Sequence, residues 1–575
     1  MSTGTCDTAR AHKPPRMTPT GARLFVCALV ALVAAACTQA SDRSDPSPSR
    51  ADDSRGATEP GARGPWFRSA CDLPVPQLRR IRRGNHPGRS PDVTVVPARP
   101  HFFGGFTVTT HAGPWGYLQR VPLVFYGPGF IRPRGEIELG GQVTLADVAP
   151  TLARLLDVKW PAARRGQPLD EVLVPAERRA LNLRLIVTVV WDGGGWNVLE
   201  TWPQAWPHLR RLMSAGTSIN NVAVGTSPSV TPAVHTTIGT GSWPKQHGIV
   251  DIPLRTGSRI ETSFEDMAPN RLLLQTLGDL YDRATDNAAE VGMIAERSWH
   301  LGMLGHGSYL DGGDKDDAVM WTEDYDLVTN SRYYSLPGYL EKVGGFEDAT
   351  RTIDLEDGRA DDNWMGHDLS NPGTLHLSPV WSLHQTNLLK SLIDNEGYGK
   401  DGVADLLFTN YKEIDLVGHV WNMVNEEMRS TIGASDVALA ELRRFLDAEV
   451  GRERWVMVVT ADHGQAPAPK RIGAWPIAID VVEEDAARHF DVDAKDLFSD
   501  ERPTGFWLDR DFAADRGITA EELSRFLLGY RMRDNVTDAS EVPQQYRDRM
   551  NEKLFTAAFP NAHLGPIWAC AKGTT

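Results

Sequence analysis

Carboxylates and histidines follow three short apolar runs of the 575-residue sequence, either directly or a few residues beyond each run. These side chains are Asp192, Asp415, His419, Asp462 and His463. Carboxylate oxygens and imidazole nitrogens are donors that zinc prefers and that manganese and iron accept. One Asp-Gly or Asp-His pair after a strand is usually incidental, but five donors after three runs favour a divalent metal site.

A buried parallel sheet would bring these donors together. Short apolar runs bounded by turn residues and followed by helical patterns predict such a sheet, and the clearest runs are 185–191, 406–411, 455–460 and 121–126. In open α/β sheets the ligand site lies beyond the carboxyl ends of the strands. We therefore expect a doubly wound α/β fold, with a mainly parallel central sheet and helices on both faces.

Thr231 is a candidate nucleophile near this site. Pro232 suits the first turn of a helix, which places Thr231 at the predicted N-cap. The free N–H groups and the positive end of that helix would bind a phosphate and favour an alkoxide, and a metal can remove the hydroxyl proton. The simpler interpretation is a plain N-cap, and Ser229 and Thr226 are competing hydroxyls.

Composition and charge exclude several classes of protein. A chain of 575 residues exceeds what one hydrophobic core supports, so a second compact unit is expected. Its 41% hydrophobic and 23% charged residues are typical of an ordinary folded protein. The net charge of −15 argues against nucleic acid as the main partner, and neither GxxxxGK[ST] nor GxGxxG occurs.

The first part of the chain predicts export. Basic residues precede an apolar run at 24–36, so we interpret residues 1–36 as a signal peptide and residues 37–66 as a disordered linker. Small residues directly before Cys37 resemble a lipoprotein box, which predicts lipidation of Cys37; plain secretion after Ala36 is the alternative. Either way the location is extracytoplasmic, and any contact with a membrane is through the lipid anchor.

The cysteine count leaves one pair for the folded part. Cys6 and Cys27 leave with the signal peptide and Cys37 is the candidate anchor, so Cys71 and Cys570 remain. In an oxidising compartment these two are expected to form a disulfide, whereas two separate thiols are the alternative.

Four sequence blocks together resemble the alkaline phosphatase superfamily, specifically its nucleotide pyrophosphatase/phosphodiesterase-like branch. They are Asp192-Gly193, the stretch from Thr231 and His235 to Ile249, Asn410 to His419, and Thr460 to Gly464. The resemblance implies two divalent metal ions, with zinc the expected metal. One ion would take Asp192, Thr231, Asp462 and His463, and the other Asp415, His419 and one further histidine.

His111 is our assignment for that further histidine. Residues 92–156 resemble the terminal segment of the family, which implies a circular permutation. Residues 67–175 would then be the permuted segment, and residues 176–575 the main catalytic domain with α+β cap insertions at about 255–400 and 465–550. The alternative is that His111 is an ordinary loop residue and His563 is the ligand.

The resemblance implies hydrolysis of phosphate esters through a phosphothreonine at Thr231. Phosphodiesters, including lipid or nucleotide small molecules, are the preferred substrates, because Arg297 is the only plausible cation for the outer phosphate oxygens and Glu296 opposes it. Ile252 also replaces an asparagine found in many relatives. A phosphate monoesterase of the same fold and a non-catalytic surface-binding lipoprotein are the alternatives.

Overall fold

A nine-stranded sheet is the largest element of the computed structural model, which describes residues 64–105 and 109–574. In spatial order its strands are β13 (Leu327–Val328), β12 (Asp317–Trp321), β11 (Val291–Ile294), β16 (Asp405–Tyr411), β6 (Leu185–Trp191), β17 (Trp455–Thr460), β3 (Leu123–Tyr126), β7 (Thr217–Ile219) and β4 (Gly135–Ile137). The five strands from β12 to β17 run parallel to one another. The predicted α/β class with a mainly parallel sheet is confirmed.

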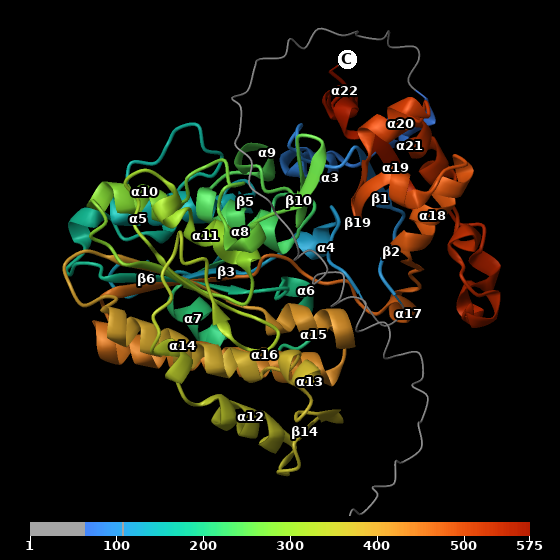
Figure 1. Ribbon diagram of the computed structural model, residues 1–575. Coiled ribbons are helices and arrows are strands. Elements are labelled where there is room, and N and C mark those ends of the chain that lie inside the picture. The colour runs from blue at the N-terminus through green and yellow to red at the C-terminus, as the bar shows by residue number, and fades with distance from the viewer. Residues whose placement is uncertain (1–63, 106–108, 575) are drawn as a thin grey trace, which may run out of the picture. The chain divides into compact units, whose positions relative to one another are not determined.

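Helices cover both faces of this sheet, because alternate residues of its central strands point to opposite sides (Figure 1). In β6, Ile186 and Val190 join one core, whereas Val187 and Val189 join the other. The first core packs against α5 (Val148–Leu156), α8 (Thr231–Thr240), α10 (Leu277–Thr285) and α11 (Leu301–Leu304). The second packs against α7 (Pro207–Ala215), α14 (Val380–Glu396) and α16 (Glu426–Leu446).

Strand β3 departs from the expected parallel arrangement. It pairs antiparallel with β17, with Leu123 opposite Thr460 and Tyr126 opposite Met457. Periodicity alone predicts a buried strand but does not give its direction, which explains the error. Because β3 starts where β17 ends, the segment that precedes β3 lies at the carboxyl edge of the parallel strands.

A smaller antiparallel sheet belongs to the same compact unit as the central sheet, because the described residues form one unit and do not divide into the two that the length predicts. Its strands, in spatial order, are β19 (Phe498–Arg502), β20 (Gly505–Leu508), β1 (Val93–Pro97) and β21 (Phe555–Pro560). A separate core includes residues of this sheet, of α2 (Pro65–Cys71), α18 (Ile479–His489), α21 (Ala520–Gly529) and α22 (Leu564–Ala571). Both ends of the described chain, α2 and α22, therefore pack against the core of this smaller sheet.

Two sequence-based boundaries need correction. The expected cap at 255–400 contains β11 and β12, which are strands of the central sheet. The expectation is wrong because these two buried runs are short and long polar segments separate them. The predicted linker at 37–66 extends too far, since Pro65 and Trp66 already belong to α2 and Trp66 is buried.

Several expectations fall on residues that the structure does not describe. The signal peptide, Cys37 and the linker up to residue 63 lie outside the described residues. Among the residues that are described, no helix combines the length and the apolar character needed to cross a bilayer.

The predicted disulfide joins Cys71 of α2 to Cys570 of α22, across 499 residues of sequence. A crosslink that closes so long a loop restricts the unfolded chain, so its loss should lower the free energy of unfolding by about 2–4 kcal/mol. We expect Cys71→Ser with Cys570→Ser to unfold at lower urea than the wild-type protein, and dithiothreitol to lower the wild-type midpoint to that of the variant. Equal midpoints for wild type and variant without reductant would contradict this.

Candidate active site

The acidic and histidine side chains that follow β6, β16 and β17 meet at the carboxyl edge of the sheet. His463 Nε2 lies 3.5 Å from Asp192 Oδ1 and 3.2 Å from Asp462 Oδ2. His419 Nε2 lies 3.4 Å from Asp415 Oδ1, because the two residues are one turn apart on α15 (Glu413–Trp421). All five donors predicted from the three runs are thus within one small volume.

His111 reaches the same place from the segment before β3. Its Nε2 lies 3.7 Å from Asp415 Oδ1, and its ring stacks on the ring of His463 with centroids 3.5 Å apart. The competing candidate, His563, pairs instead with Glu521 of α21 at 2.8 Å. The reversed direction of β3 is what carries His111 to the carboxyl edge.

All three imidazoles are oriented by backbone carbonyls. The Nδ1 atoms of His111 and His463 lie 2.8 Å from the Ser229 carbonyl and 3.1 Å from the Gly464 carbonyl, and Nδ1 of His419 contacts the Thr109 carbonyl. A carbonyl oxygen only accepts, so each Nδ1 donates its proton. Each Nε2 then faces the carboxylates, and an imidazole oriented through Nδ1 in this way is the usual arrangement of a metal-binding histidine.

The donor set fits divalent cations. Single ligand atoms of Asp192, Asp462 and His463 lie within 4.8 Å of one another, and so do those of His111, Asp415 and His463. Asp462 Oδ2 and His463 Nε2 are buried and make no hydrogen bond within the described chain. The two atoms lie 3.2 Å from each other, and a cation shared between them would satisfy both.

Thr231 is the first residue of α8, and Val230 is the N-cap. The expected N-cap position is therefore wrong by one residue. The Thr231 hydroxyl accepts from Lys412 Nζ at 3.2 Å, beside the carboxylates that Lys412 also contacts, and the residue is 4% exposed. Its hydroxyl is thus available for chemistry, while the unpaired N–H groups of the first helical turn start at the same point.

Lys412 is a component of the site that the sequence did not predict. Its Nζ lies 2.6 Å from Asp415 Oδ2, 3.0 Å from Asp192 Oδ1 and 3.2 Å from Thr231 Oγ1. Burial would lower the pKa of Lys412, but Asp192 and Asp415 outweigh burial and raise it above its usual range. The only sequence signal is a lysine directly after the buried strand β16, three residues before Asp415.

Asp192 is held by a further set of buried polar groups. Asn410 Nδ2 donates to Asp192 Oδ2 at 3.0 Å and lies 2.9 Å from His235 Nε2. His300 Nε2 lies 3.5 Å from the same Asp192 oxygen. His235 belongs to the block from Thr231 to Ile249, where its spacing of four residues from Thr231 signals one helical face, whereas nothing in the sequence indicated His300.

Arg297 does not offer a free cation. Its guanidinium lies 2.9 Å from Glu296 and 3.4 Å from Glu323, so both neighbouring carboxylates neutralise it. Glu296 also lies 3.2 Å from His376, and the hydrogen bond with His376 and the charge of Arg297 hold the pKa of Glu296 at about 2 against the opposing effect of burial. The role predicted for Arg297 in substrate binding therefore lacks support from its contacts.

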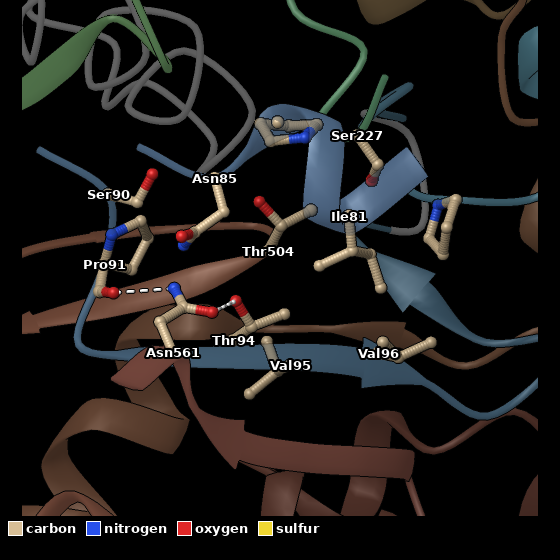
Figure 2. A pocket seen from close by; sticks show the side chains of 13 residues that line it. Ile81, Asn85, Ser90, Pro91, Thr94, Val95, Val96, Ser227, Thr504 and Asn561 are labelled. Atoms are coloured by element: carbon tan, nitrogen blue, oxygen red, sulfur yellow. Dashed lines mark hydrogen bonds between the residues drawn. The ribbon is translucent and has the colours of Figure 1, made fainter. Parts of the chain in front are cut away.

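A pocket lined in part by Ser227 and Pro228 of the loop that precedes α8 has no catalytic character (Figure 2). It is lined by apolar and neutral polar side chains, among them Ile81, Ser227 and Thr504. Its polar groups bond to one another: Asn561 accepts from Thr94 at 2.8 Å and donates to the Pro91 carbonyl at 2.7 Å. No titratable side chain lines it, so it offers no charge to a phosphate.

Alkaline phosphatases are among the known proteins that are similar to this chain. Alkaline phosphatase PafA of Elizabethkingia meningoseptica is 22% identical over 389 residues, which cover 59% of this chain and 70% of that protein. Alkaline phosphatase PhoV of Synechococcus elongatus is 22% identical over 339 residues, and this chain spans 60% of its length. The crystal structure of wild-type PafA matches the fold with a TM-score of 0.51 at 18% identity, over 66% of this chain and 85% of that one.

The family itself follows from a longer match. Residues 186–570, from β6 to α22, match the model of type I phosphodiesterases / nucleotide pyrophosphatases. This range includes all the site residues described above except His111, which lies before it. The chain therefore belongs to the type I phosphodiesterase / nucleotide pyrophosphatase family, a family of phosphoric ester hydrolases.

Proposed function

We propose that this protein hydrolyses phosphodiesters with Thr231 as the nucleophile and two divalent cations, zinc being the expected metal. The observation that carries the proposal is the convergence of three buried carboxylates and three oriented imidazoles, with Lys412 in contact with both the carboxylates and the Thr231 hydroxyl. Asp192, Thr231, Asp462 and His463 would hold one ion. Asp415, His419 and His111 would hold the other.

Bound cations would supply Lewis-acid charge to the Thr231 hydroxyl and to the departing oxygen. Thr231 loses its hydroxyl proton as Oγ1 attacks phosphorus, the bond from phosphorus to the leaving oxygen breaks, and that oxygen takes up a proton from solvent to leave as an alcohol. The phosphothreonine that forms keeps the other ester group of the diester. Water then attacks the phosphothreonine, which releases the phosphate product and restores the hydroxyl. The free N–H groups at the start of α8 stabilise the phosphoryl oxygens during both displacements.

Charge balance favours a diester over a monoester. Two divalent ions bring four positive charges, while the Asp192, Asp415 and Asp462 carboxylates with a Thr231 alkoxide bring four negative ones. Without Lys412 these charges cancel, and a neutral site suits the single charge of a diester. The contacts of Arg297 with Glu296 mean that Arg297 does not supply a cation for a second charge.

Phosphate monoester hydrolysis is the second candidate, and Lys412 is the observation that favours it. Its ammonium adds one positive charge within 3.2 Å of the Thr231 hydroxyl. Such a charge would favour the more anionic monoester, and the two relatives compared above are named alkaline phosphatases.

We also propose the chain organisation that the sequence suggested. Residues 67–175 would be a circularly permuted segment that supplies His111, which is supported by the start of the family match at residue 186. Export, with an anchor at Cys37 or as a secreted protein, stays a proposal of the same kind. The substrate is a small phosphate ester, such as a nucleotide or lipid ester.

Replacing His111 tests the metal site. His111→Ala removes one imidazole from the second ion, so we expect the zinc content to fall from about two to about one per chain. His563→Ala is the matched control, because His563 pairs with Glu521 and should leave the metal content unchanged. Plasma mass spectrometry of both purified variants measures this. Full metal content in His111→Ala would contradict the assignment.

Replacing Lys412 tests its charge. Lys412→Met removes an ammonium that lies against two expected ligand carboxylates, so zinc should bind at least about tenfold more tightly, while turnover falls. Lys400→Met is the control, since Lys400 is exposed and contacts Asp394 at 3.0 Å. Calorimetric titration with zinc measures the affinities, and unchanged or weaker binding in Lys412→Met would refute the role of the ammonium.

Replacing Thr231 tests the nucleophile. We expect Thr231→Ala to lower hydrolysis of bis-p-nitrophenyl phosphate at least about 1000-fold while metal remains bound, and Thr231→Ser to retain measurable turnover. Wild-type kcat/KM should be higher for this diester than for p-nitrophenyl phosphate. Unchanged turnover in Thr231→Ala would exclude the nucleophile, and a preference for the monoester would select the second candidate.

A further inference from the structure

A second set of carboxylates lies at the opposite edge of the central sheet. Asp282 belongs to α10, and Asp314 and Asp316 lie in the loop that leads into β12. One carboxylate oxygen of each lies within 4.8 Å of those of the other two. Because β12 runs parallel to the strands that carry the catalytic residues, its start is at the far edge from them.

Two members of this cluster are buried without hydrogen-bond partners. Asp282 is 5% exposed and Asp316 is 4% exposed. Within the described part of the chain, Asp282 Oδ1 and Asp316 Oδ2 have no hydrogen bond. An unpaired buried carboxylate is costly, so these atoms point to a ligand that supplies positive charge.

The described side chains around the cluster do not supply that charge. The groups whose charges act on Asp316 are the four carboxylates of Asp279, Asp282, Asp314 and Asp317. Lys315 directs its Nζ to the Ser331 carbonyl at 2.6 Å. The nearby His306 pairs with Asp279 at 2.7 Å.

Burial and like-charge repulsion both raise the pKa values of the buried carboxyl groups in this cluster. Burial, with the charges of Asp314 and Asp279, raises the pKa of Asp282 to about 8. Burial, with the charges of Asp282, Asp279 and Asp314, raises the pKa of Asp316 well above its ordinary value. Two of three neighbouring carboxylates therefore resist ionisation unless a cation accompanies them.

We propose that Asp282, Asp314 and Asp316 bind a calcium ion. The donors are all carboxylate oxygens, whereas zinc prefers nitrogen or sulfur and magnesium requires nearly ideal octahedral geometry. Asp314 is exposed, so water can complete the coordination and the ion can exchange. The ion joins α10 to the start of β12 and so secures the edge of the central sheet.

Thermal unfolding of the zinc-loaded protein tests the proposal. Calcium chloride at millimolar concentration should raise the Tm of the wild-type chain by about 3 °C or more. Asp316→Asn should abolish this rise, because it removes a charged ligand at nearly constant shape. Asp311→Asn is the matched control, an exposed aspartate of the same loop outside the cluster, and should keep the full rise.

Two further variants keep the result interpretable. Asp314→Asn changes an exposed ligand, so it should fold and lose the calcium response even where Asp316→Asn fails to fold. Asp415→Asn alters the catalytic edge and should keep the response, which separates the two sites. No rise in the wild-type chain, a rise that survives Asp314→Asn, or a rise lost in Asp415→Asn would each overturn the calcium site.

Discussion

Three buried carboxylates at one edge of a sheet impose the constraint on which the rest of this structure depends. Asp192, Asp415 and Asp462 are each 2% exposed or less, so water contributes little to stabilising their charges. Burial would raise the pKa of Asp192, but the Lys412 ammonium outweighs burial and lowers it. One lysine does not balance three carboxylates. Asp462 Oδ2 and His463 Nε2, which make no hydrogen bond within the described chain, indicate where further positive charge belongs.

The fold meets this constraint through strand direction. β6, β16 and β17 end at the same edge, so they deliver their following residues to one place without long loops. β3 runs the opposite way and starts at that edge, which allows the preceding segment to add His111. Strand direction also separates the proposed metal site from the acidic cluster at the start of β12, because that cluster lies at the opposite ends of the parallel strands.

Much of this arrangement could be predicted from sequence, for identifiable reasons. Asp192 and Asp462 follow β6 and β17 by one or two residues, so their side chains must lie at the carboxyl edge once the strands are recognised. Long-range geometry is different: the direction of β3 depends on pairing partners far away in the chain, and β11 and β12 are short strands separated by polar segments. Lys412 was missed because a lysine next to a strand is ordinarily solvated, and only the assembled site shows that carboxylates surround it.

The central claim is that the converging donors hold metal ions, which anomalous X-ray diffraction at the zinc absorption edge tests most directly. A crystal of the zinc-loaded protein should show one peak bounded by Asp192, Asp462 and His463, and a second bounded by Asp415, His419 and His111. A map with no peak at the carboxyl edge of the sheet, or with peaks only at other positions, would contradict the account.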